Sequence, residues 1–134
     1  MMNIIDVTCA VIVRYEYFLV TQRGEQMSRA GKWEFPGGKV EKDETEEQCL
    51  LREIKEELNI GIRIKRRLMP VVHHYNDISI RLVPFLAEIQ TGDIELKEHL
   101  NFKWVKNEEL EHLDWAPADI PVVKQISDSP LKFY

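Results

Sequence analysis

The chain has 134 residues, of which 44% are hydrophobic and 31% are charged, a composition typical of a globular protein and not of a disordered one. Its length predicts one compact domain over residues 1–134, and its formal net charge of −5 excludes the broad basic face that binding to duplex nucleic acid requires. No hydrophobic run approaches the roughly 18 residues of a membrane helix, and no basic segment precedes the hydrophobic stretch near the N-terminus. We therefore expect a cytoplasmic protein with no membrane span and no signal peptide.

The first part of the chain shows strand and turn signals. Runs rich in β-branched and aromatic residues at 7–13 and 17–22 predict a hairpin. Both cysteines, Cys9 in this hairpin and Cys49 farther along the chain, are expected to be small core residues. The sequence FPGG at 35–38 then breaks the chain, because proline fixes φ and glycine permits positive φ. A helix is predicted to follow.

The limits of that helix can be placed from its capping residues. Thr45, followed three residues later by Gln48, has the form of a capping box and predicts the start. Asn59 predicts the end, because asparagine readily adopts the left-handed conformation there. The residues expected on the buried face are Leu50, Leu51, Ile54 and Leu58.

Glutamates lie beside this hydrophobic stripe when residues are placed about 100° apart, namely Glu46, Glu53, Glu56 and Glu57. Like charges at helical spacing cost about 0.2–0.5 kcal/mol per pair, and acids in the last turns meet the negative end of the helix dipole. A bound divalent cation reverses both penalties, because clustered carboxylates are the hard oxygen ligands that Mg²⁺ and Mn²⁺ prefer. The alternative is a solvated acidic helix face.

The middle of the chain is predicted to form extended strands. Residues 62–74 predict one long strand, and Asn76-Asp77 predicts a turn into a second strand at 78–89. The hydrophobic alternation of the second strand changes parity beside Pro84, which cannot donate a ladder hydrogen bond. A bulge or a sheet edge is therefore predicted at that point.

The last third combines one strand with helices. Residues 100–105 predict a short strand, 107–113 a short helix capped by Asn107, and 120–126 a terminal helix with Pro121 in its first turn. Strands outnumber helices, and hairpins mix with crossovers. The order predicts an α/β domain with a mixed sheet between helices.

The acidic helix also carries a recognisable motif. Gly38, a gap of five residues, Glu44, a gap of seven residues and the sequence REIKEELNI at 52–60 resemble the Nudix box, with Asn59 where the family has glycine. The resemblance extends to TQRGEQ, WEFPGGKVE and WAPADIP, which cover most of the chain. It implies a Nudix-like α/β/α sandwich and a MutT-type nucleoside triphosphate pyrophosphohydrolase, most similar to the bacterial CTP pyrophosphohydrolase branch.

The resemblance implies a set of metal ligands. Glu53, Glu56 and Glu57 match the box carboxylates that hold divalent metals, with the Gly37 carbonyl as a backbone ligand. Glu98 matches a MutT-type metal-binding glutamate outside the box, although by itself it is only an acid in an exposed loop. The implied cofactor is Mg²⁺, or Mn²⁺ in its place.

The resemblance also implies catalytic and phosphate-binding roles. In the family, water attacks the β-phosphorus of a nucleoside triphosphate, and either Glu53 or Glu98 is expected to act as the general base. Glu44 and Arg52 match a pair that holds the loop against the helix, which is as well explained by a structural ion pair. Arg23 corresponds to a phosphate-contacting arginine, a role that suits its planar guanidinium.

Recognition of the base is expected to involve Asp119, at the position where MutT-type enzymes read the base edge. The alternative is a helix N-cap, for which this aspartate is well placed. A carboxylate accepts from an exocyclic amine, as in cytosine or guanine, and disfavours the carbonyl edge of uracil or thymine. Phe35, Tyr75 and Leu82 are candidate stacking walls, or else plain core residues.

Three functions follow as hypotheses. The first is a pyrophosphohydrolase of CTP, dCTP or oxidised nucleotides, which would serve nucleotide-pool sanitation. The second keeps this chemistry for 8-oxo-dGTP or for another nucleoside diphosphate conjugate, and the third is a non-catalytic nucleotide-binding module. A monomer and a homodimer are both compatible with the sequence.

Overall fold

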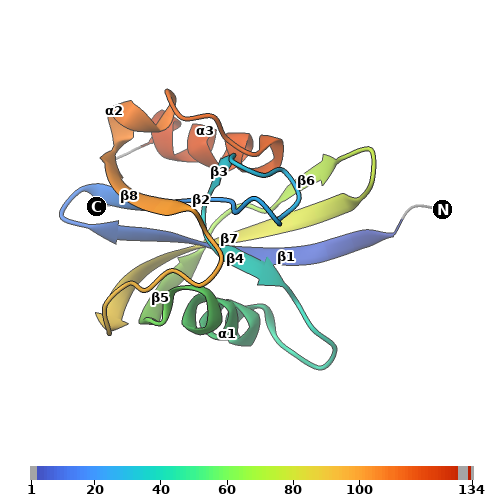
Figure 1. The fold of residues 1–134 in the computed structure, drawn as a ribbon, viewed down its shortest axis with the longest axis horizontal. Coiled ribbons are helices and arrows are strands. Elements are labelled where there is room, and N and C mark those ends of the chain that lie inside the picture. The colour runs from blue at the N-terminus through green and yellow to red at the C-terminus, as the bar shows by residue number, and fades with distance from the viewer. Residues whose placement is uncertain (1–2, 130–132, 134) are drawn as a thin grey trace.

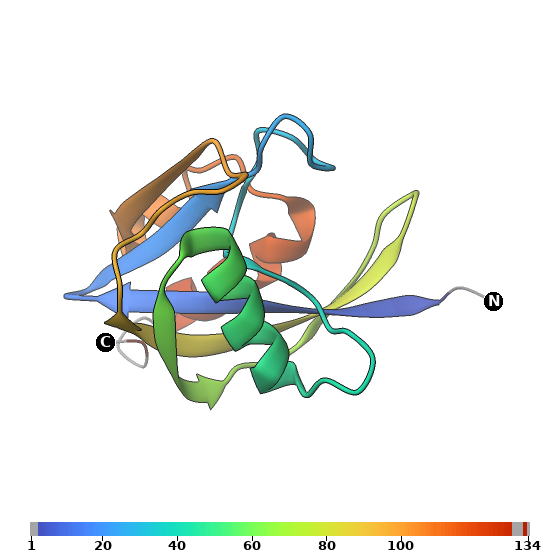
Figure 2. The same cartoon turned by 60° about the horizontal axis from the view of Figure 1, so that its bottom comes forward.

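The computed structural model describes residues 3–129 and 133, and in this part of the chain eight strands form one mixed sheet between helices (Figures 1 and 2). The strands are β1 Ile4–Arg14, β2 Tyr17–Gln22, β3 Trp33–Glu34, β4 Gly37–Lys39, β5 Gly61–Arg67, β6 Val71–His74, β7 Ser79–Thr91 and β8 Asn101–Lys106. The helices are α1 Glu46–Leu58, α2 Asn107–Leu110 and α3 Ile120–Asp128, the last preceded by the 3₁₀ turn η1 Pro117–Asp119.

The centre of the sheet is a parallel pair, β1 with β7, in which Ile4 lies opposite Ser79 and Ile12 opposite Ala87. The main strand order is β3-β2-β1-β7-β5, while β4, β6 and β8 pair with β1, β7 and β2 respectively. All the pairs apart from β1 with β7 are antiparallel. The predicted mixed sheet is therefore confirmed, and with it the hairpin of β1 and β2, whose turn residues both have positive φ.

The helices form two layers around the sheet. Figure 1 shows α1 below it and α2 with α3 above it, which is the expected α/β/α arrangement. Each layer has its own hydrophobic core. Leu50, Ile54 and Leu58 of α1 are fully buried against the sheet, and burying each such side chain contributes about 1.5–3 kcal/mol. Within residues 3–129 and 133, no helix has the length and hydropathy needed to cross a bilayer.

Both predicted caps of α1 are present. The Thr45 side chain accepts from the backbone N–H of Gln48 at 3.0 Å, and the Gln48 side chain accepts from the Thr45 N–H at 2.9 Å. Asn59 ends the helix with φ 59°, in the left-handed region, and its N–H bonds to the carbonyl of Lys55. Local sequence therefore fixes both ends of the helix.

The predicted buried face of α1 is wrong at one residue. Leu51 is 45% exposed, whereas Cys49 is fully buried. The segment entering the helix covers the Cys49 side, where the thiol bonds to the carbonyls of Gly38 and Lys39 at 3.4 and 3.3 Å. The tertiary path of this segment, which helical spacing cannot show, decides which flank of the stripe is buried.

The two long strands predicted in the middle of the chain also need correction. The first is divided into β5 and β6 by residues 68–70, which include Pro70. In β7, Pro84 lies neither at a bulge nor at a sheet edge, because β7 is central and pairs with β1 through this residue. Residues 82–87 are buried on both faces of the sheet, which explains the loss of alternation. Pro84 lies where β7 exchanges β6 for β5 as its antiparallel partner, so its missing N–H breaks no ladder.

The short helix α2 ends earlier than expected. It begins at Asn107 and ends at Leu110, so Asn107 is its first residue and not its cap. The carboxylate of Glu109 accepts from the backbone N–H of Lys106 at 3.2 Å, which gives this donor at the start of the helix a hydrogen-bond partner. The terminal helix α3 has Pro121 in its first turn, as predicted.

Candidate active site

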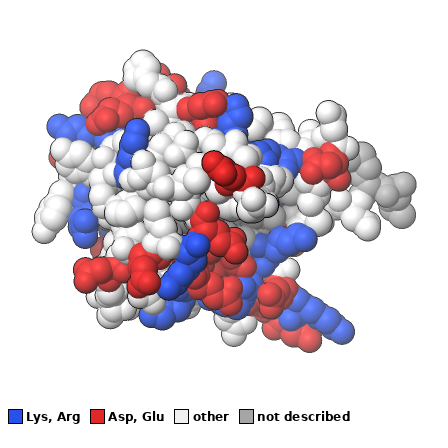
Figure 3. Space-filling view, in the orientation of Figure 1, with Lys and Arg blue, Asp and Glu red and all other residues white. Residues whose placement is uncertain are grey.

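Arg52 organises the acidic end of α1. Its guanidinium donates to both carboxylate oxygens of Glu44, at 2.7 and 3.0 Å, and also to Glu53 at 2.7 Å and Glu56 at 3.2 Å. The hydrogen bonds from Arg52 lower the pKa of Glu44 to about 2. The expected Glu44–Arg52 ion pair is thus present and joins the preceding loop to the helix. Figure 3 shows acidic side chains gathered over the lower half of this face, where α1 lies.

Glu57 differs from the other acids because it is buried without compensation. Its side chain is 20% exposed, and its Oε2 atom is buried with no hydrogen-bond partner. Burial, then the negative charges of Glu34 and Glu53, raise the pKa of Glu57 to about 9. A buried carboxyl group that lacks a counter-charge is a costly feature for a fold to keep.

The acids fit a divalent cation in their chemistry but are not arranged around one. Within residues 3–129 and 133, no group of three or more potential ligands is assembled in metal-binding geometry. Arg52 holds oxygens of Glu53 and Glu56, while the unpaired oxygen of Glu57 is left to attract a cation. The Glu53 carboxylate lies so close to the Cα of Gly38 that a side chain there would collide with it. These hard oxygen donors suit Mg²⁺ or Mn²⁺.

A second polar chain runs from Arg23 toward α1. Arg23 donates from Nη1 to Glu34 Oε1 at 2.5 Å, and the other oxygen of Glu34 lies 2.8 Å from His99 Nε2. The His99 ring is fully buried, and the same Nε2 lies 4.0 Å from Glu57 Oε2. Arg23 also bonds to Ser28, at its carbonyl and its hydroxyl. The expected phosphate ligand is therefore already engaged by protein groups.

Glu98 lies beside this chain, in the exposed segment that joins β7 to β8. Its backbone carbonyl packs against Gly24, where any side chain would collide with it. The neighbouring Leu100 N–H bonds to the carbonyl of Gln22 at 2.9 Å. The segment that carries Glu98 is thus held against the loop that begins at Arg23.

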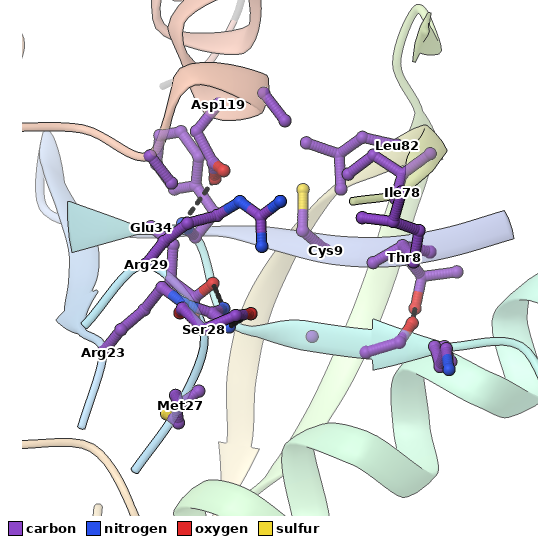
Figure 4. Close-up of a pocket in the computed structure, with 18 of the residues that line it drawn as sticks. Thr8, Cys9, Arg23, Met27, Ser28, Arg29, Glu34, Ile78, Leu82 and Asp119 are labelled. Carbon is purple, nitrogen blue, oxygen red and sulfur yellow. Dashed lines mark hydrogen bonds and ion pairs between the residues drawn. The ribbon is translucent and has the colours of Figure 1, made fainter. Parts of the chain in front are cut away.

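A cavity of about 360 Å³ opens next to these groups (Figure 4). Of the residues expected from the sequence to form the site, those that line the cavity are Arg23, Phe35, Gly37, Glu57, Tyr75, Leu82 and Asp119. Those that do not line it are Glu44, Arg52, Glu53, Glu56 and Glu98. The expected residues thus divide into an acidic end and a cavity, with Glu57 belonging to both.

Asp119 points into the molecule and not along its helix. It is 5% exposed, its side chain makes no capping bond to α3, and its Oδ2 accepts from the Phe35 backbone N–H at 2.9 Å. Burial, then the charge of Glu34, raise the pKa of Asp119 well above its usual range. The N-cap alternative is therefore wrong for the side chain, which instead lines the cavity.

The three candidate stacking walls differ in their surroundings. Phe35 packs its ring on Trp115 with centroids 4.8 Å apart, and Leu82 is 3% exposed, so both are core residues with one side on the cavity. Tyr75 has its ring covered by the guanidinium of Arg29, whose Cζ lies 3.5 Å from the ring centroid. Its hydroxyl accepts from the Ala118 N–H at 2.9 Å.

Sequence reasoning missed four residues of this region: Cys9, Arg29, Glu34 and His99. Cys9 was assigned to the core, and it is buried as expected but also lines the cavity. For Glu34 and His99, the available signal was a charged residue inside a short hydrophobic strand and a histidine directly after Glu98. No local pattern indicates Arg29, because its partners lie in another hairpin.

The chain is similar to known proteins over most of its length. The NUDIX domain family matches residues 8–125 of the chain. A CTP pyrophosphohydrolase of Escherichia coli K12 is 37% identical over 126 residues, which cover 92% of this chain and 91% of the relative. An 8-oxo-dGTP diphosphatase of the same strain is 33% identical over 107 residues, which cover 80% and 83% of the two chains.

Solved structures show the same likeness. A MutT protein of methicillin-resistant Staphylococcus aureus 252, described as a Nudix hydrolase, superposes with a TM-score of 0.77 at 39% identity, covering 96% of this chain and 98% of the other. A MutT protein of Methanosarcina mazei Go1 superposes with a TM-score of 0.87 at 24% identity, covering 96% of both chains. The second likeness concerns the fold alone.

Proposed function

The chain belongs to the NUDIX family of phosphoanhydride hydrolases, and on that premise we propose that it converts cytidine triphosphates, CTP or dCTP, and water to the nucleoside monophosphate and pyrophosphate. Members of the family act on nucleotides and generally use divalent metal ions. For this chain we propose Mg²⁺, which Mn²⁺ can replace, because the donor atoms are carboxylate oxygens.

The observation that carries the proposal is the unpaired buried oxygen of Glu57, at the junction of the acidic helix end and the cavity. Glu53, Glu56 and Glu57 of α1 would hold the cation, with Glu98 and the Gly37 carbonyl completing the set. The bound cation would neutralise charge on the phosphate oxygens and lower the pKa of water at the site. A polyphosphate that reaches from the cavity toward α1 would then lie along Glu57, whose buried Oε2 has no hydrogen-bond partner within residues 3–129 and 133.

Other side chains would accept a proton, orient a phosphate or hold the loop in place. Glu53 or Glu98 would accept a proton from the attacking water, each being a carboxylate at the edge of the site. Arg23 would orient a phosphate with the N–H groups that Glu34 and Ser28 leave unused. The Glu44–Arg52 pair would keep the loop that carries Gly38 fixed against the helix, which is a positioning role.

Preference for cytosine rests on Asp119. Its carboxyl group lines the cavity and is anchored by the Phe35 N–H, so one oxygen is fixed and the other, in the ionised carboxylate, can accept from an exocyclic amine. Uracil and thymine would present a carbonyl to it instead. The relative named as a CTP pyrophosphohydrolase, 37% identical, supports this choice.

An oxidised guanine nucleotide is the second candidate. Guanine also carries an exocyclic amine, and the relatives include an 8-oxo-dGTP diphosphatase that is 33% identical. Both activities belong to nucleotide-pool sanitation, the role that we propose for the enzyme.

Hydrolysis of a panel of nucleoside triphosphates with Mg²⁺ tests the proposal. CTP and dCTP are expected to give the highest kcat/KM, with pyrophosphate as the product rather than orthophosphate. Preferential hydrolysis of 8-oxo-dGTP would select the second candidate. Absence of metal-dependent turnover for every triphosphate would refute the function itself.

The general base can be identified with two variants and a control on the same helix. Glu53→Gln and Glu98→Gln are each assayed across the acid limb of the kcat profile, because loss of the base removes that limb. Glu47→Gln, at an exposed position of α1, is the matched control and is expected to behave as wild type.

A further inference from the structure

Arg29 lines the cavity but has no role in the proposed mechanism. It belongs to the loop between β2 and β3, where its backbone has a φ of 54°. Its side chain is 19% exposed and lines the cavity. Figure 4 shows the side chain directed into the cavity.

The guanidinium of Arg29 is held in place by the β6–β7 hairpin. Its Cζ lies 3.5 Å from the centroid of the Tyr75 ring, and its Nη2 donates to Asp77 Oδ1 at 2.6 Å. Tyr75 is itself fixed, because its hydroxyl accepts from the Ala118 N–H and its ring meets His73 edge-on at 4.4 Å. The plane of the Arg29 head group is therefore set by an aromatic ring bonded to the turn that carries Asp119.

One donor atom of this head group is buried without a partner among the described residues. The Nε atom of Arg29 is buried and has no hydrogen-bond partner. The other cavity arginine, Arg23, donates from Nε, Nη1 and Nη2 to Ser28 and Glu34. A buried N–H without an acceptor is rare, so the guanidinium at this cavity wall retains donor capacity for a ligand.

We infer that Arg29 determines base specificity by donating a hydrogen bond to a carbonyl oxygen of the nucleobase, while Asp119 accepts from the exocyclic amine of the same base. This inference rests on the proposed function, in which the cavity holds the base. Together the two residues require a base that carries both an amine and a carbonyl group.

The required combination divides the common bases. Cytosine and guanine each carry an exocyclic amine and a carbonyl oxygen, and so satisfy both residues. Adenine has the amine without a carbonyl, and uracil and thymine have carbonyls without the amine. Arg29 thus rejects adenine, Asp119 rejects uracil and thymine, and the size of the cavity is left to separate cytosine from guanine.

The test is the effect of Arg29→Ala on base preference. The ratio of kcat/KM for CTP over ATP is expected to fall about tenfold, because one directed hydrogen bond to the base edge is lost. The ratio for CTP over UTP is expected to stay unchanged, because Asp119 is intact. Hydrolysis of inorganic tripolyphosphate, which has no base, is expected to remain at the wild-type rate.

A binding measurement separates this inference from the hydrolytic function. Calorimetric titration with CMP and AMP reports base selection without any turnover, and wild type is expected to prefer CMP while Arg29→Ala does not. An unchanged CMP preference in the variant overturns the inference even if hydrolysis is as proposed. Loss of tripolyphosphate hydrolysis in the variant also overturns it, since Arg29 would then act on phosphate.

Two further variants exclude a merely structural role. Asp77→Ala removes the tether but leaves the guanidinium on Tyr75, and it is expected to retain most of the CTP preference. If Asp77→Ala reproduces the full effect of Arg29→Ala, Arg29 only ties the loop to the hairpin and the inference fails. Arg63→Ala is the matched control, because it removes an exposed arginine of β5 that pairs with Glu88 of β7. It is expected to leave base preference and melting temperature unchanged.

Discussion

The acidic end of α1 and the neighbouring cavity are built in different ways. Glu53, Glu56 and Glu57 stand on one helix within two turns, and Arg52, the counter-ion of the first two, belongs to the same helix. The cavity is formed by segments from β1, the β2–β3 loop, the β6–β7 hairpin and the turn before α3. The first region is a product of local sequence, whereas the second exists only when distant segments meet, and we propose that chemistry belongs to the first and selectivity to the second.

The variant Glu57→Gln is expected to have the largest effect, and it tests whether chemistry and base selectivity are separate. We expect kcat to fall at least a hundredfold for every nucleotide, because a ligand of the cation is lost, while the ratios between bases stay the same. Nucleotide-panel kinetics with Mg²⁺ measure both quantities. A changed base preference in this variant would show that the two regions are not separate.

The same variant has an opposite effect on stability without metal. The pKa of Glu57 is raised from 4.5 to about 9 in the folded protein, so wild type loses stability as the pH rises through this interval. Glutamine does not titrate and escapes that loss. Urea unfolding in a chelator is therefore expected to show Glu57→Gln more stable than wild type, by a margin that grows from pH 5 to pH 9.

The variant Asp119→Asn is expected to do the opposite of Glu57→Gln, changing base preference and not turnover in general. The asparagine side chain can keep an acceptor on the Phe35 N–H and present its amide N–H groups to the base, which favours a carbonyl over an amine. The preference for CTP over UTP is expected to fall about tenfold or more, with little change in tripolyphosphate hydrolysis. Parallel kinetics on CTP, UTP and tripolyphosphate provide the measurement, and an equal loss on all three would contradict the assignment of Asp119 to the base.

Metal binding provides another test of the difference between the acidic end of α1 and the cavity. Saturating Mg²⁺, at a hundred times its dissociation constant, is expected to stabilise wild type and Asp119→Asn alike by about 2.7 kcal/mol, and Glu57→Gln much less. At pH 7 the Glu57 carboxyl is protonated in the metal-free protein, since its pKa is about 9, so binding should release protons. Titration calorimetry in buffers of different ionisation enthalpy counts them, and absence of release would contradict a ligand role for Glu57.

The smallest expected effect is that of Glu44→Gln on stability. The pKa of Glu44 is lowered from 4.5 to about 2, so its pairing with Arg52 stabilises the fold above pH 4.5 and is lost as the pH falls toward 2. The variant is expected to melt below wild type at pH 7, and the difference is expected to vanish near pH 2. Thermal melts across this range follow it, and a constant difference would show that charge is not the cause.

The same contrast explains what the sequence could predict. The ends of α1 and its acid set follow from helical spacing and capping, which depend on neighbours in the chain. The Glu44–Arg52 pair was implied by the family resemblance. Leu51 was misplaced because burial at the flank of the stripe depends on the path of the segment through Gly38. Pro84 was misread because a strand covered on both faces loses the alternation that reveals its orientation.

The polar contacts of the cavity lay beyond such reasoning. The Arg23–Glu34 pair lies within the β2–β3 hairpin, but the Glu34–His99 contact and the Arg29–Tyr75 stack join segments far apart in the chain. The partner of a buried charge cannot be predicted from spacing in the sequence. Asp119 shows the limit clearly. Its position before α3 favours a cap, yet its side chain turns to the Phe35 N–H, because that backbone group is buried and needs an acceptor.

The parallel pairing of β1 with β7 has a consequence for how the molecule assembles. Ile4 and Ser79 must meet across more than half of the chain, so the central ladder closes a long loop and is entropically slow to form. Helix α1, whose backbone hydrogen bonds are local, can form and break much faster. During refolding, helical circular dichroism should therefore recover before the nucleotide-binding signal, and the enzyme should become able to choose its substrate only in the last step.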